Sequence, residues 1–405
     1  MRSLGRGRVA VLASVVLVSG VLMVPAMTDV AHAAVQTVAI AVDHSPPSGH
    51  DFEYVDFFPR SGVKIHSGDV IDFGWASSPD GFHTATLLKT GETPAQAWAA
   101  HPLAVPDADD GPSQLQLNPS ITNPTFPSAG SGAPGACGSA AKPCVYNGSA
   151  ELNSGANGSD GVSHFFVKVN VPAGTTVNVV CLVHPGMTGS FDVVGAGTAA
   201  STPSALASAT ASQASADTSG ALAAEAAAST PQVSTNADGT HTVTLTAGTA
   251  TNHVEVVEML PSAETITAGD TVRWVTRTIK EIHTVTFPQG NNPLTNPVPS
   301  YCEGTPDVLY NGPPSATACG GDPSKLETHV DPAPVGSTVI ASPVTVASSG
   351  LISNPPSPFA RGYSFTFSNA GTYTYQCEIH EHMTGTLTVL AKAATAVTAT
   401  PTLTG

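Results

Sequence analysis

A short motif rich in metal-binding side chains occurs twice in this sequence of 405 residues. Its two copies are Cys181-Leu-Val-His184-Pro-Gly-Met187 and Cys377-Glu-Ile-His380-Glu-His-Met383. A thiolate, an imidazole and a thioether form a soft donor set of the kind that copper favours. A further histidine stands far upstream of each copy, as Gly-Phe-His83-Thr-Ala-Thr and as Glu-Ile-His283-Thr-Val-Thr. Each half of the chain therefore offers two His, one Cys and one Met.

This donor set is that of a type 1 copper site, in which two imidazoles and a thiolate surround the metal and a Met is a weak axial ligand. Such a site moves one electron and performs no substrate chemistry of its own. The upstream histidine opens a segment that alternates like a strand, whereas the other three donors share one loop between two predicted strands. A rigid sheet beneath these segments would fix the donors before the metal arrives.

Both halves resemble the cupredoxin family, and the Cys-x2-His-x2-Met loop is similar to the short loop of amicyanin. The resemblance implies a Greek-key β-sandwich with copper at one end of each half, hence two copper ions per chain, cycling between Cu+ and Cu2+. The ligands that it implies are His83, Cys181, His184 and Met187 in the first half, and His283, Cys377, His380 and Met383 in the second. It also implies that His184 and His380 face an exposed surface and are the electron exits.

Internal repetition supports a tandem arrangement independently of the family. Gly68-Asp69 lies fourteen residues before His83, and Gly269-Asp270 lies thirteen before His283. We therefore expect an all-β fold of two tandem Greek-key sandwiches joined by a flexible linker rich in Ala, Ser and Thr. The expected ranges are 35–195 for the first domain, 196–232 for the linker, 233–390 for the second domain and 391–405 for a flexible tail.

The first 33 residues predict export. Three arginines precede an apolar stretch from Val9 to Val24, and Ala31-His-Ala33 supplies a small-residue cleavage site, which is typical of a secretory signal peptide. No later stretch approaches the roughly 20 apolar residues that a membrane span needs. We expect a secreted protein, released or loosely retained at the cell surface, with no transmembrane span in the mature chain.

Four cysteines remain outside the motifs, and each pair lies in a long segment rich in Gly, Pro, Ser and Asn. Exported proteins favour disulfides, which predicts the pairs Cys137–Cys144 and Cys302–Cys319. The alternative is two pairs of free thiols. Both pairs lie in long insertions that a minimal domain of this kind lacks.

The formal net charge of −16 bears on partners. An acidic protein is steered toward basic surfaces and away from nucleic acid, so we expect redox partner proteins with basic docking surfaces. The alternative is that the charge keeps an exported protein soluble.

Three functions are compatible with these residues. The first is a carrier of single electrons, which is not an enzyme. The second is extracellular copper capture or storage, which the same soft donors would serve. The third, a two-domain oxidase or nitrite-reductase-like enzyme, is disfavoured because the sequence lacks the paired His-x-His segments of the additional copper centres. His382 lies between two expected ligands and is either an exposed bystander or a residue that modifies the potential or contacts a partner.

Overall fold

The computed structural model describes residues 35–393 except 76–82, 107–114, 123–136, 157–163, 279, 291–299, 303–325, 331–333, 355–359 and 381. The expected signal peptide, 1–33, and most of the expected tail, 391–405, lie outside these residues. In the part of the chain that the structure describes, no helix has both the length and the apolar character that a membrane span requires.

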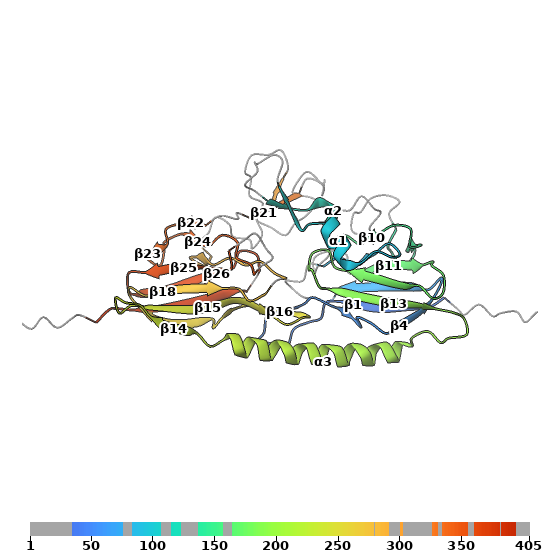
Figure 1. Cartoon of the computed structure of the whole chain (residues 1–405), viewed down its shortest axis with the longest axis horizontal. Coiled ribbons are helices and arrows are strands. Elements are labelled where there is room, and N and C mark those ends of the chain that lie inside the picture. Colours follow the sequence, from blue (N-terminus) through green and yellow to red (C-terminus); the bar gives the residue numbers. More distant parts are fainter. Residues whose placement is uncertain are drawn as a thin grey trace, which may run out of the picture. The chain divides into compact units, whose positions relative to one another are not determined.

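The first half forms a β-sandwich of two five-stranded sheets (Figure 1). One sheet has the order β3-β1-β5-β11-β9, with bounds Phe57–Phe58, Thr37–Val42, Val70–Trp75, His164–Val169 and Cys144–Tyr146. The other has the order β10-β6-β12-β13-β4, with bounds Leu152–Asn153, Thr86–Leu87, Thr176–Val180, Thr188–Val194 and Val63–His66. Alternate residues of β11, Phe165, Val167 and Val169, are buried between the sheets, as period-two patterning requires.

The second half repeats this strand order. One sheet contains β16-β15-β18-β25-β23, with bounds Val254–Leu260, His241–Ala250, Thr271–Val275, Gly362–Phe367 and Val339–Ile340, and β14 (Gln232–Thr235) pairs with β15. The facing sheet has the order β17-β27-β26-β19-β24-β22, with bounds Ala263–Thr267, Thr384–Leu390, Gly371–Gln376, Thr286–Phe287, Ala347–Ser348 and Val335–Gly336. The central pairings β1–β5 and β15–β18 are both parallel, and β12–β13 and β26–β27 are both antiparallel. The all-β tandem architecture is thus confirmed.

The repeated Gly-Asp pair has a structural role in both halves. The Asp69 carboxylate accepts hydrogen bonds from the backbone N–H groups of His66 (2.7 Å) and Gln36 (2.9 Å). The Asp270 carboxylate likewise accepts from Thr267 (2.8 Å) and His241 (2.7 Å). Each aspartate thereby ties the entry of one sheet to a strand of the other.

The two sandwiches share a sheet. Strand β2 (Phe52–Tyr54) of the first half pairs antiparallel with β16 of the second, and Glu53 lies opposite Glu255. These glutamates are equivalent in the repeat, since each lies five residues before the apolar residue of an X-Pro pair, Phe58-Pro59 or Leu260-Pro261. Equivalent segments therefore meet across an approximate twofold axis between them.

The predicted flexible linker is wrong for most of its length, because Pro203–Ala228 forms a 26-residue helix, α3 (Figure 1). Thr202 caps it, its side chain accepting from the N–H of Ala205, and Pro203 occupies the first turn. Ala214, Ala221 and Ala228 recur every seven residues, on one face. This face packs on the apolar side chains of β2, β3 and β16, which are Phe52, Tyr54, Phe58, Val254, Val256 and Leu260.

Polar contacts hold the same helix to the first sandwich. Asp217 receives two hydrogen bonds from the Arg60 guanidinium, at 2.9 and 2.7 Å. The Gln213 amide donates to the carbonyl of Phe57 at 2.8 Å, and the hydroxyls of Tyr54 and Thr218 are 2.6 Å apart. Most of the segment between the sandwiches is thus a helix that packs on the shared sheet and is bonded to the first sandwich.

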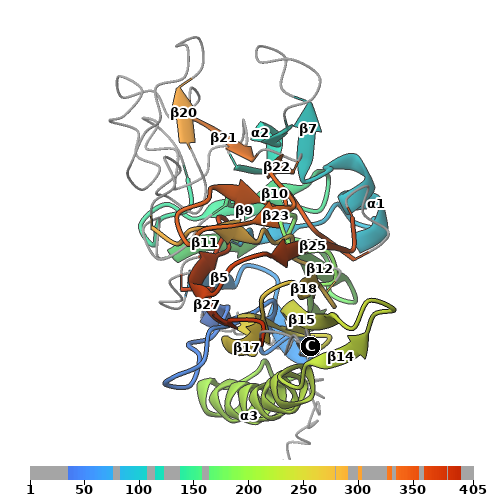
Figure 2. The ribbon, with the colours of Figure 1, turned by 90° about the vertical axis from the view of Figure 1, so that its left-hand side faces the viewer.

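The structure describes parts of both insertions. In the first, α1 (Pro94–Ala100), β7 (Ala104–Pro106), β8 (Leu115–Leu117) and α2 (Pro119–Thr122) follow one another, and the second contains β20 (Ser300–Cys302) and β21 (Leu326–Val330). Strand β21 pairs with β8, so the two insertions form one small sheet of the order β20-β21-β8-β7 (Figure 2).

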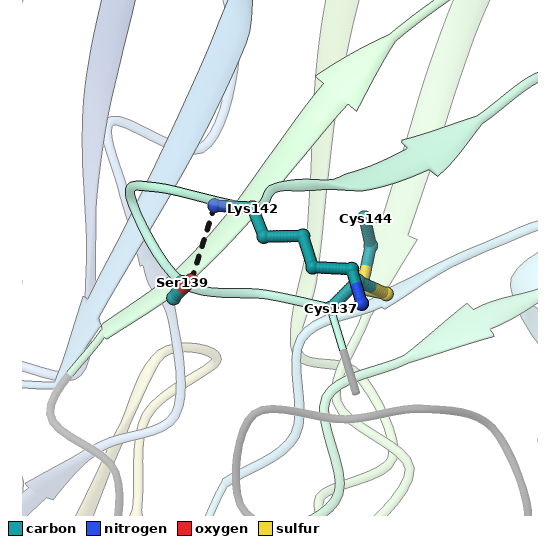
Figure 3. The surroundings of a disulfide bond; sticks show 4 residues. All are labelled: Cys137, Ser139, Lys142 and Cys144. Atoms are coloured by element: carbon teal, nitrogen blue, oxygen red, sulfur yellow. Dashed lines mark hydrogen bonds between the residues drawn. A yellow bond between two sulfur atoms is a disulfide. The ribbon is translucent and has the colours of Figure 1, made fainter. Parts of the chain in front are cut away.

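The disulfide Cys137–Cys144 is present, with Cα atoms 4.8 Å apart (Figure 3). It closes a short turn in which the backbone N–H of Lys142 donates to the Ser139 hydroxyl at 3.1 Å. Cys319, and with it the predicted Cys302–Cys319 pair, lies outside the described residues.

Candidate metal centres

The candidate donors of the first set lie in two loops next to a pair of neighbouring strands in one sheet. His83 precedes β6, and Cys181 and His184 follow β12, which pairs with β6. The two histidine Nδ1 atoms are 2.9 Å apart, and the Cys181 sulfur lies 3.9 Å from that of His83 and 3.7 Å from that of His184. All three residues are buried.

The second set has the same construction. His283 precedes β19, and Cys377 and His380 follow β26. The Nδ1 atoms of the two histidines are 3.2 Å apart, and the Cys377 sulfur is 3.6 Å from that of His380. In both sets the three donor atoms lie within 4.8 Å of one another.

Each methionine closes its ligand loop. Met187 and Met383 are fully buried. The carbonyl of Met187 accepts the N–H of Cys181 at 3.1 Å, and that of Met383 accepts the N–H of Cys377 at 2.8 Å. The sequence-predicted methionines therefore belong to the same compact loops as the other donors.

A threonine after each upstream histidine locks the cysteine in place. The N–H of Thr84 donates to the Cys181 sulfur at 3.3 Å, while its hydroxyl accepts the N–H of Leu182 at 2.8 Å. Thr284 repeats both bonds with Cys377 and Glu378, at 3.4 and 2.8 Å. One side chain thus joins two loops that are nearly a hundred residues apart in the sequence.

The donor atoms of the first set fit a single small metal ion. A point equidistant from the two Nδ1 atoms and the sulfur lies about 2.1 Å from each, within the roughly 2.0–2.3 Å of metal–nitrogen and metal–sulfur bonds. Two imidazoles and one thiolate, with a thioether in the same loop, match the donor preference of copper.

The electrostatics of both sets favour a thiolate. Burial raises the pKa of Cys181, but hydrogen bonds and charges from His184 and His83 outweigh it, so that the pKa lies well below its usual value. Cys377 behaves in the same way with His283 and His380. The thiolate is the form that binds a metal.

The upstream histidines differ in their surroundings. The Nε2 atom of His83 lies 3.6 Å from the Asp43 carboxylate and 3.4 Å from that of Glu53. Burial lowers the pKa of His83, but these contacts and the Cys181 sulfur raise it to about 9. His283 has no carboxylate at either distance among the described residues, and burial lowers its pKa.

The loop histidines do not face solvent, contrary to the expectation for electron exits. His184 is only 3% exposed and His380 only 6%. The Nε2 atom of His184 lies 2.6 Å from one oxygen of Glu281, and that of His380 lies 3.3 Å from the other. The two sites therefore approach each other through a single buried carboxylate.

Sequence reasoning missed three buried glutamates at this interface, Glu53, Glu255 and Glu281. Burial raises the pKa of Glu53 to about 7 and that of Glu255 to about 8. Burial acts on Glu281 in the same direction, but the charge of His184 and contacts with both loop histidines lower its pKa far more. The equal offset of Glu53 and Glu255 from the X-Pro pairs was a usable signal, whereas nothing in the repeat marks Glu281.

His382 is exposed, as both the bystander and the partner-contact alternatives require. Its φ of 65° matches the left-handed conformation of its counterpart Gly186, at 102°. The loop of each half thus turns at the same point.

Similarity to known proteins is found among solved structures. No family model matches the chain, and the search of curated proteins gives no match. Amicyanin from Paracoccus versutus is 17% identical over 40% of this chain and 92% of its own, with a TM-score of 0.19. A fern plastocyanin mutant is 18% identical over 36% of this chain and 98% of its own, with a TM-score of 0.18.

A copper-containing nitrite reductase from Thermus scotoductus spans both halves. It is 12% identical over 89% of this chain and 68% of its own, with a TM-score of 0.20. The solved structures to which the chain is similar include cupredoxins and a two-domain copper nitrite reductase.

Proposed function

We propose that this chain is a secreted tandem type 1 copper protein that binds one copper ion in each half and carries single electrons. The observation that supports the proposal most directly is the convergence of two imidazole nitrogen atoms and one cysteine sulfur in each half, in buried clusters of the same construction. In this proposal copper supplies a one-electron couple between Cu(I) and Cu(II).

The protein's part is to hold the donors still. His83, His184 and Cys181 would be the ligands of the first site with Met187 as the weak axial donor, and His283, His380, Cys377 and Met383 those of the second. The Thr84 and Thr284 bonds orient each thiolate before a metal binds. Rigid donors reduce the rearrangement that a change of oxidation state would otherwise demand.

Copper storage is the principal alternative. The burial of both cysteines favours electron transfer over capture, because a storage site must exchange its ion readily. Electron exchange with a partner would then be rapid, whereas a storage protein would exchange electrons slowly and release copper to a chelator. An enzyme would require an open coordination position for substrate.

The test is the copper content and visible spectrum of the oxidised protein, with Cys181→Ser and Cys377→Ser as variants. Two coppers per chain and an intense blue thiolate band, halved by either substitution, are the expected result. A colourless copper protein would contradict the proposal. Identification of the mature N-terminus after export tests the secretion part separately.

A further inference from the structure

The ligand loop of the first half is closed by the second half. Its His184 is almost fully buried, and the Lys280 amine lies only 3.6 Å from where a Cβ on Gly186 would stand. The carboxylate of Glu281, the next residue, reaches His184. This short segment before His283 therefore covers the first site while it leads into the second.

Glu281 has one oxygen for each site. Its contacts with the Nε2 atoms of His184 and His380 are 2.6 and 3.3 Å, and the residue is buried. In both donor sets the Nδ1 atom points at the sulfur. A metal at Nδ1 leaves the ring proton on Nε2, so that both rings present an N–H to the carboxylate. The two rings then face the two oxygens of one carboxylate, and His184 Nε2 also lies 3.4 Å from Glu53. The 2.6 Å contact is an ion pair without hydrogen-bond alignment, because Glu281 Oε1 has no hydrogen-bond partner among the described residues.

We propose that Glu281 joins the two metal sites into one electron-transfer unit, in which His184, its carboxylate and His380 form the route between the sites. This inference rests on the proposed function. With copper bound in both halves, one electron would leave the reduced site and be taken up by the oxidised site of the same chain, and no atom or proton would leave the protein. The buried loop histidines thus serve exchange within the chain.

The experiment is pulse radiolysis of the oxidised full-length protein carrying Met383→Gln, a change of axial donor that separates the visible bands of the two sites. After a substoichiometric electron pulse, one band should recover at the rate at which the other bleaches. This rate should not depend on protein concentration. A rate proportional to concentration would overturn the proposal, because the electrons would then pass between molecules.

The decisive variant is Glu281→Gln in the same background. Its amide has one acceptor oxygen and turns an N–H donor toward the other ring, so one link is lost. We expect the exchange within the chain to slow at least tenfold. Glu281→Asp, which keeps the charge but is too short to reach both rings, should do the same. Unchanged rates in both variants would refute the route.

Glu255→Gln is the matched control. Glu255 is buried in the same interface and bonds to the Thr278 hydroxyl, and the described residues place no histidine against it. The rate of electron exchange between the two sites in Glu255→Gln should equal that of the parent protein. An equal loss of rate in this control would assign the effect to general disturbance of the interface and contradict the proposal.

Two further measurements separate this inference from the proposed function. Copper content and the blue bands of each variant report whether both sites still form, so their loss in the parent protein would defeat the proposed function itself. In the protein loaded with Cu(I), proton exchange at the two Nε2–H groups should be slow and should quicken in Glu281→Gln. A third bound metal ion lost in Glu281→Gln would overturn the bridge, because the carboxylate would then be a ligand.

Discussion

Asp43 and Gly248 occupy the same place in the two repeats but do opposite things to the upstream histidines. Their φ angles are 70° and 73°. Asp43 follows β1, which pairs in parallel with β5, and Gly248 lies within β15, at a bulge just after the residues that pair in parallel with β18. Asp43 directs a carboxylate oxygen to within 3.6 Å of His83 Nε2. A Cβ on Gly248 would lie 2.1 Å from His283 Nε2, so the second half has no room for any side chain there. The two sites are therefore built alike but charged differently.

Asp43→Asn should raise the reduction potential of the first site. A negative charge near His83 stabilises the more positive oxidised state, so its removal favours reduction. The expected shift is about 30–60 mV, which is roughly a three- to tenfold change in a one-electron equilibrium. Redox titration followed in the visible band measures it. The potential of the second site should stay constant, and a shared shift of both would contradict the argument.

Gly248→Ala should destroy the second site and spare the first. The added Cβ would collide with the His283 ring, and the positive φ adds strain. We expect the copper content to fall from two to about one per chain, with the remaining band belonging to the first site. Gly239→Ala is the control, because Gly239 also has a positive φ but has nothing within 4 Å of its would-be Cβ. Full copper loading of the Gly248 variant would be inconsistent with the close approach.

The candidate metal-binding residues could be predicted from the sequence, but the contact between the two halves could not. The residue types and their order are local, so the eight candidate donors and the repeat could be predicted directly, and the structure brings six of them together as two His-Cys-His sets. The covering of the first ligand loop by the second half could not be predicted, because it depends on strand β2 pairing with β16. The prediction that His184 and His380 are exposed was wrong for the same reason, because it treated each half as a separate domain.

The helix α3 was missed for a different physical reason. Its sequence has too few large apolar groups to form a core, which led to the expectation of a flexible linker. The large groups come instead from the strands below it, and the helix contributes small side chains at a spacing of seven. The Thr202-Pro203 start was the local signal that a helix begins there.

Ala221→Leu should destabilise the protein, because α3 packs against the shared sheet at this residue. Ala221 is fully buried against the shared sheet, and three additional carbon atoms would overpack that contact. The expected loss is about 1–3 kcal/mol in the free energy of unfolding, measured in urea. Ala223→Leu is the control on the exposed face of the same helix and should change little. Equal free energies of unfolding for the two variants would contradict the packing of α3 and favour the original prediction of a flexible linker.

Thr84→Val should weaken the first copper site without removing a ligand. The backbone bond from residue 84 to the Cys181 sulfur remains, but the buried N–H of Leu182 loses its acceptor. An unsatisfied buried donor costs roughly 1–3 kcal/mol. We expect a lower melting temperature and a shifted blue band for the first site alone. Thr284→Val should reproduce the effect in the second half, and a response in both sites to either change would argue against local locking.

Glu255 should make stability depend on pH. Burial raises its pKa from 4.5 to about 8, and the charge of Glu281 adds to this, while the Thr278 hydroxyl and Lys280 oppose it. Glu53 lies opposite on the paired strand. Since the folded pKa lies above the unfolded one, the stabilisation is complete below about pH 4.5 and is lost as the pH rises through 8.

Glu255→Gln stays neutral at every pH, so its melting temperature should match that of the parent at acidic pH and exceed it increasingly up to about pH 8. A gain of roughly 1–2 °C is expected for each kcal/mol of relieved burial, because the melting temperature of a unit of this size shifts little per kcal/mol. Thermal melts of both proteins from pH 4 to pH 9 measure the difference directly. A constant difference across this range would mean that Glu255 does not change its charge within it.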